Sequence, residues 1–148
     1  MYGGLEGGAT NSTLRIFDKH GKVLAETVGQ GTNLALMGVE KVSGAIYELV
    51  QHAFEDSNLQ GKLMESLGIA LSGADSGNKL RQELENRLAG LLSPKYLRRN
   101  NSDDTNLQVI SDIEGSVYAA THNSAIVLIA GTGSNCIFVN QKTSINGL

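Results

Sequence analysis

Two segments of this chain share one plan: a stretch that could form a strand, a short turn of glycine and hydroxyl residues, and a second stretch that could form the returning strand. The turns are Gly7-Gly8-Ala9-Thr10-Asn11-Ser12 and Gly131-Thr132-Gly133-Ser134-Asn135. Glycine and hydroxyl residues leave the backbone N–H groups of a turn accessible, as phosphate binding requires. Taken singly, each turn is more typical of an ordinary hairpin, in which glycine supplies a positive φ. The presence of both in 148 residues predicts a nucleotide clamp.

Strands and helices alternate between these two turns. Three strands of an antiparallel meander are predicted at residues 1–8, 13–18 and 22–28. Helical spacing of apolar residues predicts helices over residues 36–55, 77–92 and 114–121. Further strands are predicted at residues 67–71 and 107–111, and a final hairpin begins at Ser124. Because helices alternating with apolar strands favour parallel pairing, we expect an α/β fold with a mixed sheet flanked by helices.

Some local features of these elements can be predicted as well. Ser76 is expected to cap the second helix, whose core positions would be Leu80, Leu84, Leu88 and Leu91. The apolar stripe of the first helix consists of Val39, Val42, Ile46, Leu49, Val50 and Ala53. The polar segment 93–106 predicts an exposed loop, and Cys136 at the start of a strand predicts a packed side chain.

The charge balance limits the classes of partner. Twelve basic and 15 acidic residues give a net charge of −3, which offers no electrostatic case for nucleic acid or an anionic membrane. The longest strongly apolar run, residues 125–130, is too short to span a bilayer. One cysteine cannot form an internal disulfide framework, and the first residues show no signal peptide. We therefore expect a cytoplasmic protein.

Polar residues stand where the predicted strands end. Glu6, Ser72, Asp112 and Thr132 all lie at or just past an apparent strand end. Ligands of such sheets gather beyond the carboxyl ends of the strands, so these residues are predicted to share one cleft. For Asp112, the residues themselves favour an N-cap of the following helix over a catalytic base, since Asp is common at that position.

Several of these stretches resemble a known family. They are residues 2–10, residues 71–75, the Ser111-Asp112-Ile113-Glu114-Gly115-Ser116 segment and the second glycine turn, and Thr32-Asn33 also fits. The combination resembles the sugar kinases of the actin/hexokinase/heat-shock ATPase superfamily, and within it the N-acetylglucosamine kinases of the BadF/BadG-type ATPase branch. The resemblance implies a ribonuclease H-like (actin-like ATPase) domain. It implies that residues 1–148 form a single N-terminal lobe, with the C-terminal lobe of the family absent from this chain.

The resemblance also implies roles for individual residues. Asp112 would be the base that accepts the proton of the sugar 6-hydroxyl. The phosphates of ATP would be held by Gly8, Ala9, Thr10, Thr132 and Gly133, although Ala9 stands where many relatives have glycine. Sugar contacts would come from Asn33, Ser72, Gly73, Asp112, Ser134 and Asn135. Glu6 would orient Mg²⁺ through water, and a solvated acid at a strand end is an equal alternative.

The implied reaction converts ATP and N-acetylglucosamine into N-acetylglucosamine 6-phosphate and ADP. Without the second lobe, this chain is not expected to be catalytically competent by itself. The alternatives are a truncated, non-catalytic lobe that binds sugar or a partner chain, and a kinase or ATPase of the same branch with a different substrate. An isolated lobe would expose the apolar inter-lobe face on which its second lobe packs, so a homodimer or pairing with another chain through that face is also expected.

Overall fold

The computed structural model describes residues 1–75, 77–99, 106–121, 123–130 and 134–139. The chain divides into two compact units, Met1–Asp112 and Ile113–Leu148. A single lobe spanning residues 1–148 stays a prediction. Among the described helices, none combines the length and apolarity that crossing a bilayer requires.

The first unit contains a five-stranded sheet in the order β3-β2-β1-β4-β5. Strands β1 (Tyr2–Gly7), β2 (Asn11–Phe17) and β3 (Val23–Gln30) form the antiparallel meander that the sequence predicts. Strand β4 (Ser66–Leu71) pairs in parallel with β1, and β5 (Leu107–Ser111) pairs in parallel with β4. The predicted α/β fold with a mixed sheet is therefore confirmed.

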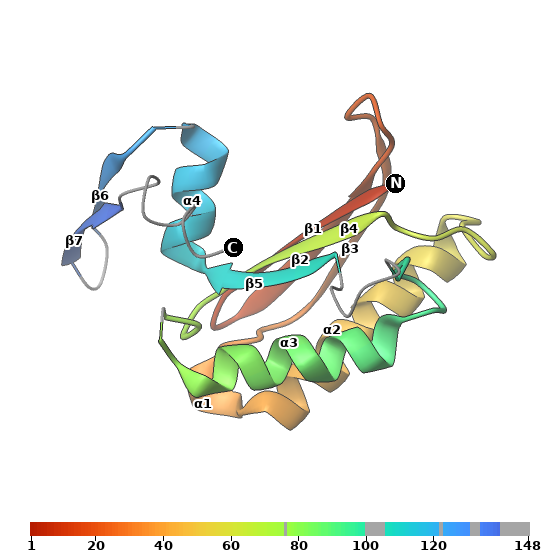
Figure 1. The fold of residues 1–148 in the computed structure, drawn as a ribbon, viewed down its shortest axis with the longest axis horizontal. Helices are drawn as coiled ribbons and strands as arrows, with labels where there is room; N and C mark the ends of the chain where they lie inside the picture. Colours follow the sequence, from red (N-terminus) through yellow and green to blue (C-terminus); the bar gives the residue numbers. More distant parts are fainter. Residues whose placement is uncertain (76, 100–105, 122, 131–133, 140–148) are drawn as a thin grey trace. The chain divides into compact units, whose positions relative to one another are not determined.

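Three helices belong to this unit: α1 (Leu34–Met37), α2 (Val39–Asp56) and α3 (Lys79–Leu92). Helices α2 and α3 pack on each other and cover one face of the sheet, where α2 contacts β2 and β3 and α3 contacts β5 (Figure 1). All six residues of the predicted apolar stripe of α2 are buried. The single helix predicted over residues 36–55 is wrong at its start, because Gly38, with φ of 77°, separates α1 from α2.

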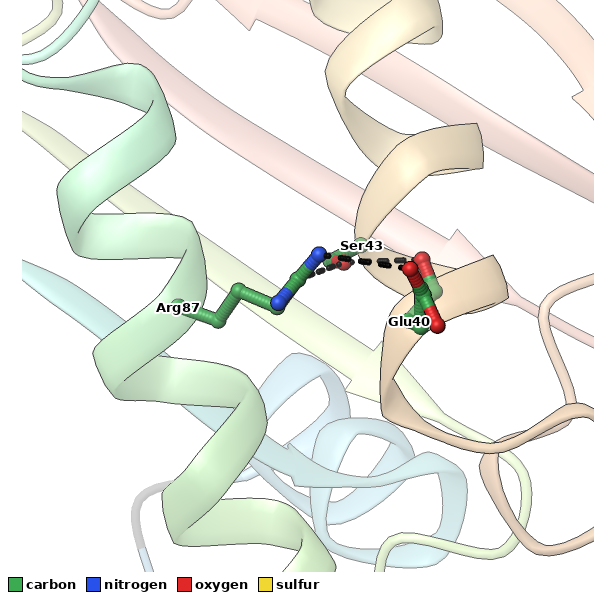
Figure 2. A network of polar contacts seen from close by, with 3 residues as sticks. All are labelled: Glu40, Ser43 and Arg87. Carbon is green, nitrogen blue, oxygen red and sulfur yellow. Dashed lines mark hydrogen bonds and ion pairs between the residues drawn. The ribbon is translucent and has the colours of Figure 1, made fainter.

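A polar contact ties α2 to α3 across their interface. The Arg87 Nε donates to the Ser43 Oγ at 2.8 Å, and the same hydroxyl donates to the Glu40 carbonyl oxygen at 2.9 Å (Figure 2). The Arg87 guanidinium also lies 3.9 Å from the Glu40 carboxylate. Because Ser43 is fully buried, the hydrogen bond satisfies a hydroxyl that would otherwise be costly between two helices. The exposed ion pair contributes little beside it.

The start and the inner face of α3 differ from the prediction. Asn78 caps the helix, since its side-chain Oδ1 accepts from the Leu80 N–H at 3.0 Å, whereas Ser76 lies outside the described residues. Leu84 and Leu88 are buried as predicted, but Leu92 takes the third core position and Leu91 is exposed. Residues four apart lie on one helical face, so the stripe through Leu84 and Leu88 continues to Leu92.

The segment after α3 is packed at its beginning, which corrects the prediction of an exposed loop over residues 93–106. Tyr96 and Leu97 belong to the core, and the Tyr96 carbonyl accepts from the Met64 N–H at 2.8 Å. The Tyr96 ring contacts the rings of Phe54 and Tyr47, with centroids 4.9 and 5.9 Å away. Arg98 and Arg99 are exposed, and residues 100–105 lie outside the described residues.

The second unit contains a hairpin of β6 (Ala125–Ala130) and β7 (Ser134–Val139), paired antiparallel as predicted. Helix α4 (Asp112–Ala120) precedes it and starts two residues earlier than predicted. Cys136 is exposed, which corrects the expectation that it is packed. It pairs with Leu128, and Ile126 pairs with Phe138, so these four exposed residues share one face of the hairpin.

Candidate functional site

Three parallel strands of the first unit end in register at one edge of the sheet. Gly7 of β1 pairs with Leu71 of β4, and Leu71 pairs with Ser111 of β5. The next residues along the chain are Gly8, Ser72 and Asp112. The structure therefore brings the ends of these strands together, and three of the predicted site residues stand there side by side in the register.

The first glycine turn spans residues 8–10 between β1 and β2. Its first residue is held by both of its backbone polar groups, because the Gly8 N–H donates to the Asn11 carbonyl at 2.9 Å and the Gly8 carbonyl accepts from the Thr32 N–H at 2.9 Å. Within the described part of the chain, the backbone N–H groups of Ala9 and Thr10 donate to no protein acceptor. Both residues are exposed, so their N–H groups and the Thr10 hydroxyl can meet an anion.

A close backbone approach supports this turn from behind. A Cβ atom on Gly31 would lie 2.2 Å from the Ala9 carbonyl oxygen, which is backbone and cannot rotate away. A Cβ atom on Gly7 would lie 2.0 Å from the Thr32 Oγ1. By contrast, a Cβ atom on Gly8 would meet nothing closer than the Asn11 carbonyl oxygen at 3.5 Å. Gly7 and Gly31 are therefore required by packing, whereas Gly8 is not.

The predicted sugar residues Asn33 and Ser72 lie in contact. The Asn33 Nδ2 donates to the Ser72 Oγ at 3.1 Å, while the Asn33 Oδ1 caps α1 by accepting from the Leu36 N–H at 3.1 Å. The Ser72 carbonyl accepts from the Leu34 N–H, and the Ser72 N–H donates to the Gly7 carbonyl, each at 2.9 Å. Part of the hydrogen-bonding capacity of Asn33 is thus used to fix the site, which the sequence did not indicate.

Gly73 completes this contact between α1 and the turn after β4. Its φ is 79°, in the left-handed region that favours glycine, and a Cβ atom there would lie 2.7 Å from the Ala35 backbone nitrogen. The turn that follows is closed by Asn78, whose Nδ2 donates to the Gly73 carbonyl at 3.4 Å. Gly73 therefore contributes to the site through its backbone, because its lack of a side chain lets the turn after β4 approach α1 closely.

Asp112 is the first residue of α4, directly after β5, and it is exposed. As the first helical residue, Asp112 lies one position after the N-cap, so the predicted N-cap role is displaced by one residue, although a carboxylate there is still stabilised by the helix dipole. The same position lies at the carboxyl edge of the sheet, as a base acting in the cleft would need. The predicted base role is compatible with the position and is not tested by it.

Glu6 lies on the face of the sheet opposite the helices. Leu5 and Gly7 on either side of it are buried, and alternate residues of a strand point to opposite faces. On that face, the Arg15 guanidinium donates a hydrogen bond to the Glu26 carboxylate, which raises the pKa of Arg15. The Glu6 carboxylate adds a smaller contribution in the same direction, so Arg15 stays charged within electrostatic reach of Glu6.

The second glycine turn is not described in the structure. Thr132 and Gly133 lie outside the described residues, although the strands that flank them, β6 and β7, are present. Ser134 and Asn135 begin β7, where their backbones pair with Ala130 and Ile129. The proposed roles of these four residues stay predictions.

Sequence reasoning missed part of the support for the first turn. The buried side chains of Ser12 and Thr32 are hydrogen-bonded, with the Ser12 Oγ 2.7 Å from the Thr32 Oγ1. Thr32-Asn33 fitted a family pattern, but no role for Thr32 followed from it. The glycine at position 31, directly after a strand, was the available signal for a close backbone approach.

In the described part of the chain, no three His, Cys, Asp or Glu side chains gather as a metal cage.

Solved structures share this fold. A proposed N-acetylglucosamine kinase from Chromobacterium violaceum superposes with a TM-score of 0.63 at 19% identity, covering 91% of this chain and 43% of that protein. Another from Porphyromonas gingivalis gives 0.67 at 18% identity, covering 95% and 45%. A ROK family glucokinase from Streptomyces griseus, solved with glucose and AMPPNP, gives 0.57 at 16% identity, covering 95% and 44%.

The chain spans less than half the length of each of these proteins. The likenesses establish the actin-like ATPase fold that the resemblance implied, with a mixed sheet and flanking helices. Family membership comes from a separate match, which covers nearly the whole chain. Because residues 4–146 match the BadF/BadG/BcrA/BcrD ATPase family, this chain belongs to that family.

Proposed function

We propose that this chain is the N-terminal lobe of an ATP-dependent sugar kinase that phosphorylates N-acetylglucosamine at its 6-hydroxyl. One observation carries the proposal: the first glycine turn, Ser72 and Asp112 follow three parallel strands that end in register. The residues proposed as a phosphate-binding turn, a sugar contact and a base therefore all follow strands that end at one edge of the sheet. Phosphoryl transfer depends mainly on such positioning and on charge stabilisation.

The first turn supplies the nucleotide contacts in this proposal. The N–H groups of Ala9 and Thr10 have no protein acceptor among the described residues, and the Thr10 hydroxyl is exposed beside them. Donors already held in place stabilise phosphate charge without reorganising during the reaction. Thr132 and Gly133 are proposed to grip the phosphates from the second turn.

Glu6 is proposed to orient Mg²⁺. The ion prefers oxygen ligands and usually keeps several waters, so one or two carboxylates and the substrate phosphates suffice. Glu6 is exposed, and two residues after it the chain enters the turn. Its carboxylate therefore fits an indirect role through water. When bound, Mg²⁺ would neutralise phosphate charge.

The sugar is proposed to bind beside α1 and the turn after β4, with contacts from Asn33, Ser72 and Gly73. Asn33 keeps hydrogen-bonding capacity beyond its bonds to Leu36 and Ser72, because a carboxamide has two N–H donors and two acceptor lone pairs. Ser134 and Asn135 are proposed as further sugar contacts.

Asp112 is proposed as the base of the reaction. Its carboxylate would accept the proton of the 6-hydroxyl while the sugar oxygen bonds to the γ-phosphorus and the bond from phosphorus to the β-γ bridging oxygen breaks. ADP and the 6-phosphate are the products. The chain by itself is proposed to be incompetent in catalysis, because the C-terminal lobe would complete the adenosine contacts. A cytoplasmic location is part of the same proposal.

Nuclear magnetic resonance titration of this chain tests the binding part of the proposal. Magnesium AMPPNP is expected to shift the amide signals of residues 8–10, and N-acetylglucosamine those of Asn33 and Ser72. Thr10→Ala should weaken nucleotide binding about tenfold, because it removes an exposed hydroxyl from the turn. Ser66→Ala, at the opposite end of β4, is the matched control. Titration without saturable shifts at the turn would refute the proposal.

The catalytic part needs a two-lobed protein that carries this chain. There, Asp112→Asn is expected to lower kcat at least about 100-fold, the usual range for loss of a general base. Near-wild-type turnover would exclude Asp112 as the base. Release of ADP that depends on the sugar separates a kinase from a non-catalytic lobe. Product identification across several amino sugars separates N-acetylglucosamine from a different substrate.

A further inference from the structure

Directly beneath the first turn lies a pair of buried hydroxyl groups. The Ser12 Oγ and the Thr32 Oγ1 are 2.7 Å apart, and the two residues are 1% and 0% exposed. Ser12 is the second residue of β2, and Thr32 lies in the connection after β3, 20 residues further along the sequence. A hydrogen bond of this kind fixes the separation and direction of the two segments more narrowly than apolar packing would.

The backbone of Thr32 also holds the turn. Its N–H donates to the Gly8 carbonyl at 2.9 Å, and the adjacent Gly31 leaves room for the Ala9 carbonyl. Thr32 therefore holds two segments in place. Its backbone N–H bonds to the Gly8 carbonyl, and its side chain bonds to Ser12 at the start of β2. Between these two fixed points lie Ala9 and Thr10, whose N–H groups are the proposed phosphate donors.

The residue after Thr32 reaches the other half of the site. Asn33 donates a hydrogen bond to the Ser72 Oγ at 3.1 Å, and the Ser72 N–H donates one to the Gly7 carbonyl at 2.9 Å. These bonds close a ring that runs from the phosphate turn through residues 32 and 33 to Ser72 and back to β1. A change at Ser72 or Asn33 can therefore reach the turn by two routes, through residues 32 and 33 to Gly8 and through the Gly7 carbonyl.

We propose that Thr32 is a positioning residue that couples sugar binding to nucleotide binding. Sugar bound at Asn33 and Ser72 restricts the backbone motion of residues 31–33. Because the Thr32 hydroxyl is bonded to Ser12, this also restricts the motion of Gly8–Thr10 and favours the backbone geometry that binds phosphate. By linkage, nucleotide bound at the turn tightens sugar binding by the same factor. The inference rests on the proposed function, since it takes the turn as the phosphate site and Asn33 with Ser72 as the sugar site.

Calorimetric titration of this chain tests the coupling. The dissociation constant for magnesium AMPPNP is measured without and with saturating N-acetylglucosamine, in the wild type and in Thr32→Val and Thr32→Ser. Valine keeps the shape of threonine but removes the hydroxyl, and serine restores it. Typical coupling factors are about fivefold or more. We expect such a factor in the wild type and in Thr32→Ser, and a clearly smaller factor in Thr32→Val, which loses the bond to Ser12 but keeps the backbone bonds to the Gly8 and Gly7 carbonyls.

A merely structural role predicts another pattern, namely lower thermal stability in Thr32→Val with an unchanged coupling factor. That pattern, or a wild-type factor of one when both ligands bind, overturns the inference and leaves the proposed function standing. Failure of the wild-type chain to bind either ligand overturns both. If Thr32→Val does not fold, Ser12→Ala removes the partner hydroxyl instead and is expected to lower the coupling factor in the same way.

Discussion

Replacing Gly31 by alanine tests the packing that shapes the first glycine turn. The new Cβ atom would lie 2.2 Å from the Ala9 carbonyl oxygen and 2.5 Å from its carbon, both backbone atoms. The turn would have to retreat by about 1 Å to restore an ordinary contact. Such a shift breaks the 2.9 Å hydrogen bond from the Thr32 N–H to the Gly8 carbonyl.

The expected cost follows from these two effects. Overpacking a close contact costs about 1–3 kcal/mol, and the lost hydrogen bond adds about 1 kcal/mol. Alanine also reduces the conformational freedom of the unfolded chain, and this stabilises the folded state by about 0.4–1 kcal/mol and offsets part of the cost. The free energy of unfolding should therefore fall by about 1–3.6 kcal/mol, with a midpoint of about 2.3 kcal/mol. For a chain of 148 residues this corresponds to a melting temperature roughly 5–10 °C lower.

Thermal and urea unfolding, followed by circular dichroism, measure this difference. Gly8→Ala is the matched control, because it adds the same methyl group within the turn itself, where its nearest neighbour would lie 3.5 Å away. Its free energy of unfolding should stay within about 1 kcal/mol of the wild type. Equal stability of the Gly31 and Gly8 variants would refute the idea that Gly31 is required by the approach of Ala9.

Three further changes test other parts of the structure. Gly44 lies exposed within α2 with no atom near its added Cβ, so Gly44→Ala should raise the free energy of unfolding by about 0.5–1 kcal/mol in urea titration; a loss would contradict the open space. Tyr96→Ala should lower it by about 3–5 kcal/mol, since the ring is buried against Phe54 and Tyr47, whereas a neutral result would restore the exposed-loop prediction. The exposed apolar face of the β6–β7 hairpin should promote self-association, so Ile126→Ser with Phe138→Ser should reduce the mass measured by light scattering at high concentration; a monomeric wild type would refute this.

Much of the fold followed from local pattern. Apolar periodicity predicted the order of strands and helices, the meander and the six-residue stripe of α2, because each segment carries this pattern in its own residues. The positions of Ser72 and Asp112 just past strand ends followed in the same way. Errors occurred where a local signal competed with packing. Gly38 interrupts a helix whose apolar pattern continues past it, and Leu92 displaces Leu91 from the core.

The sequence by itself determined the element order, the family and the residues that stand at the strand ends. Only the tertiary structure decided how those residues are held: Thr32 against Ser12, Gly31 behind Ala9, and Asn33 on Ser72 across 39 positions of sequence. The physical reason is that periodicity and turn chemistry act between neighbours in the chain. A hydrogen bond or a close contact between distant segments depends on the folded path of both, and neither segment carries a local mark of its partner.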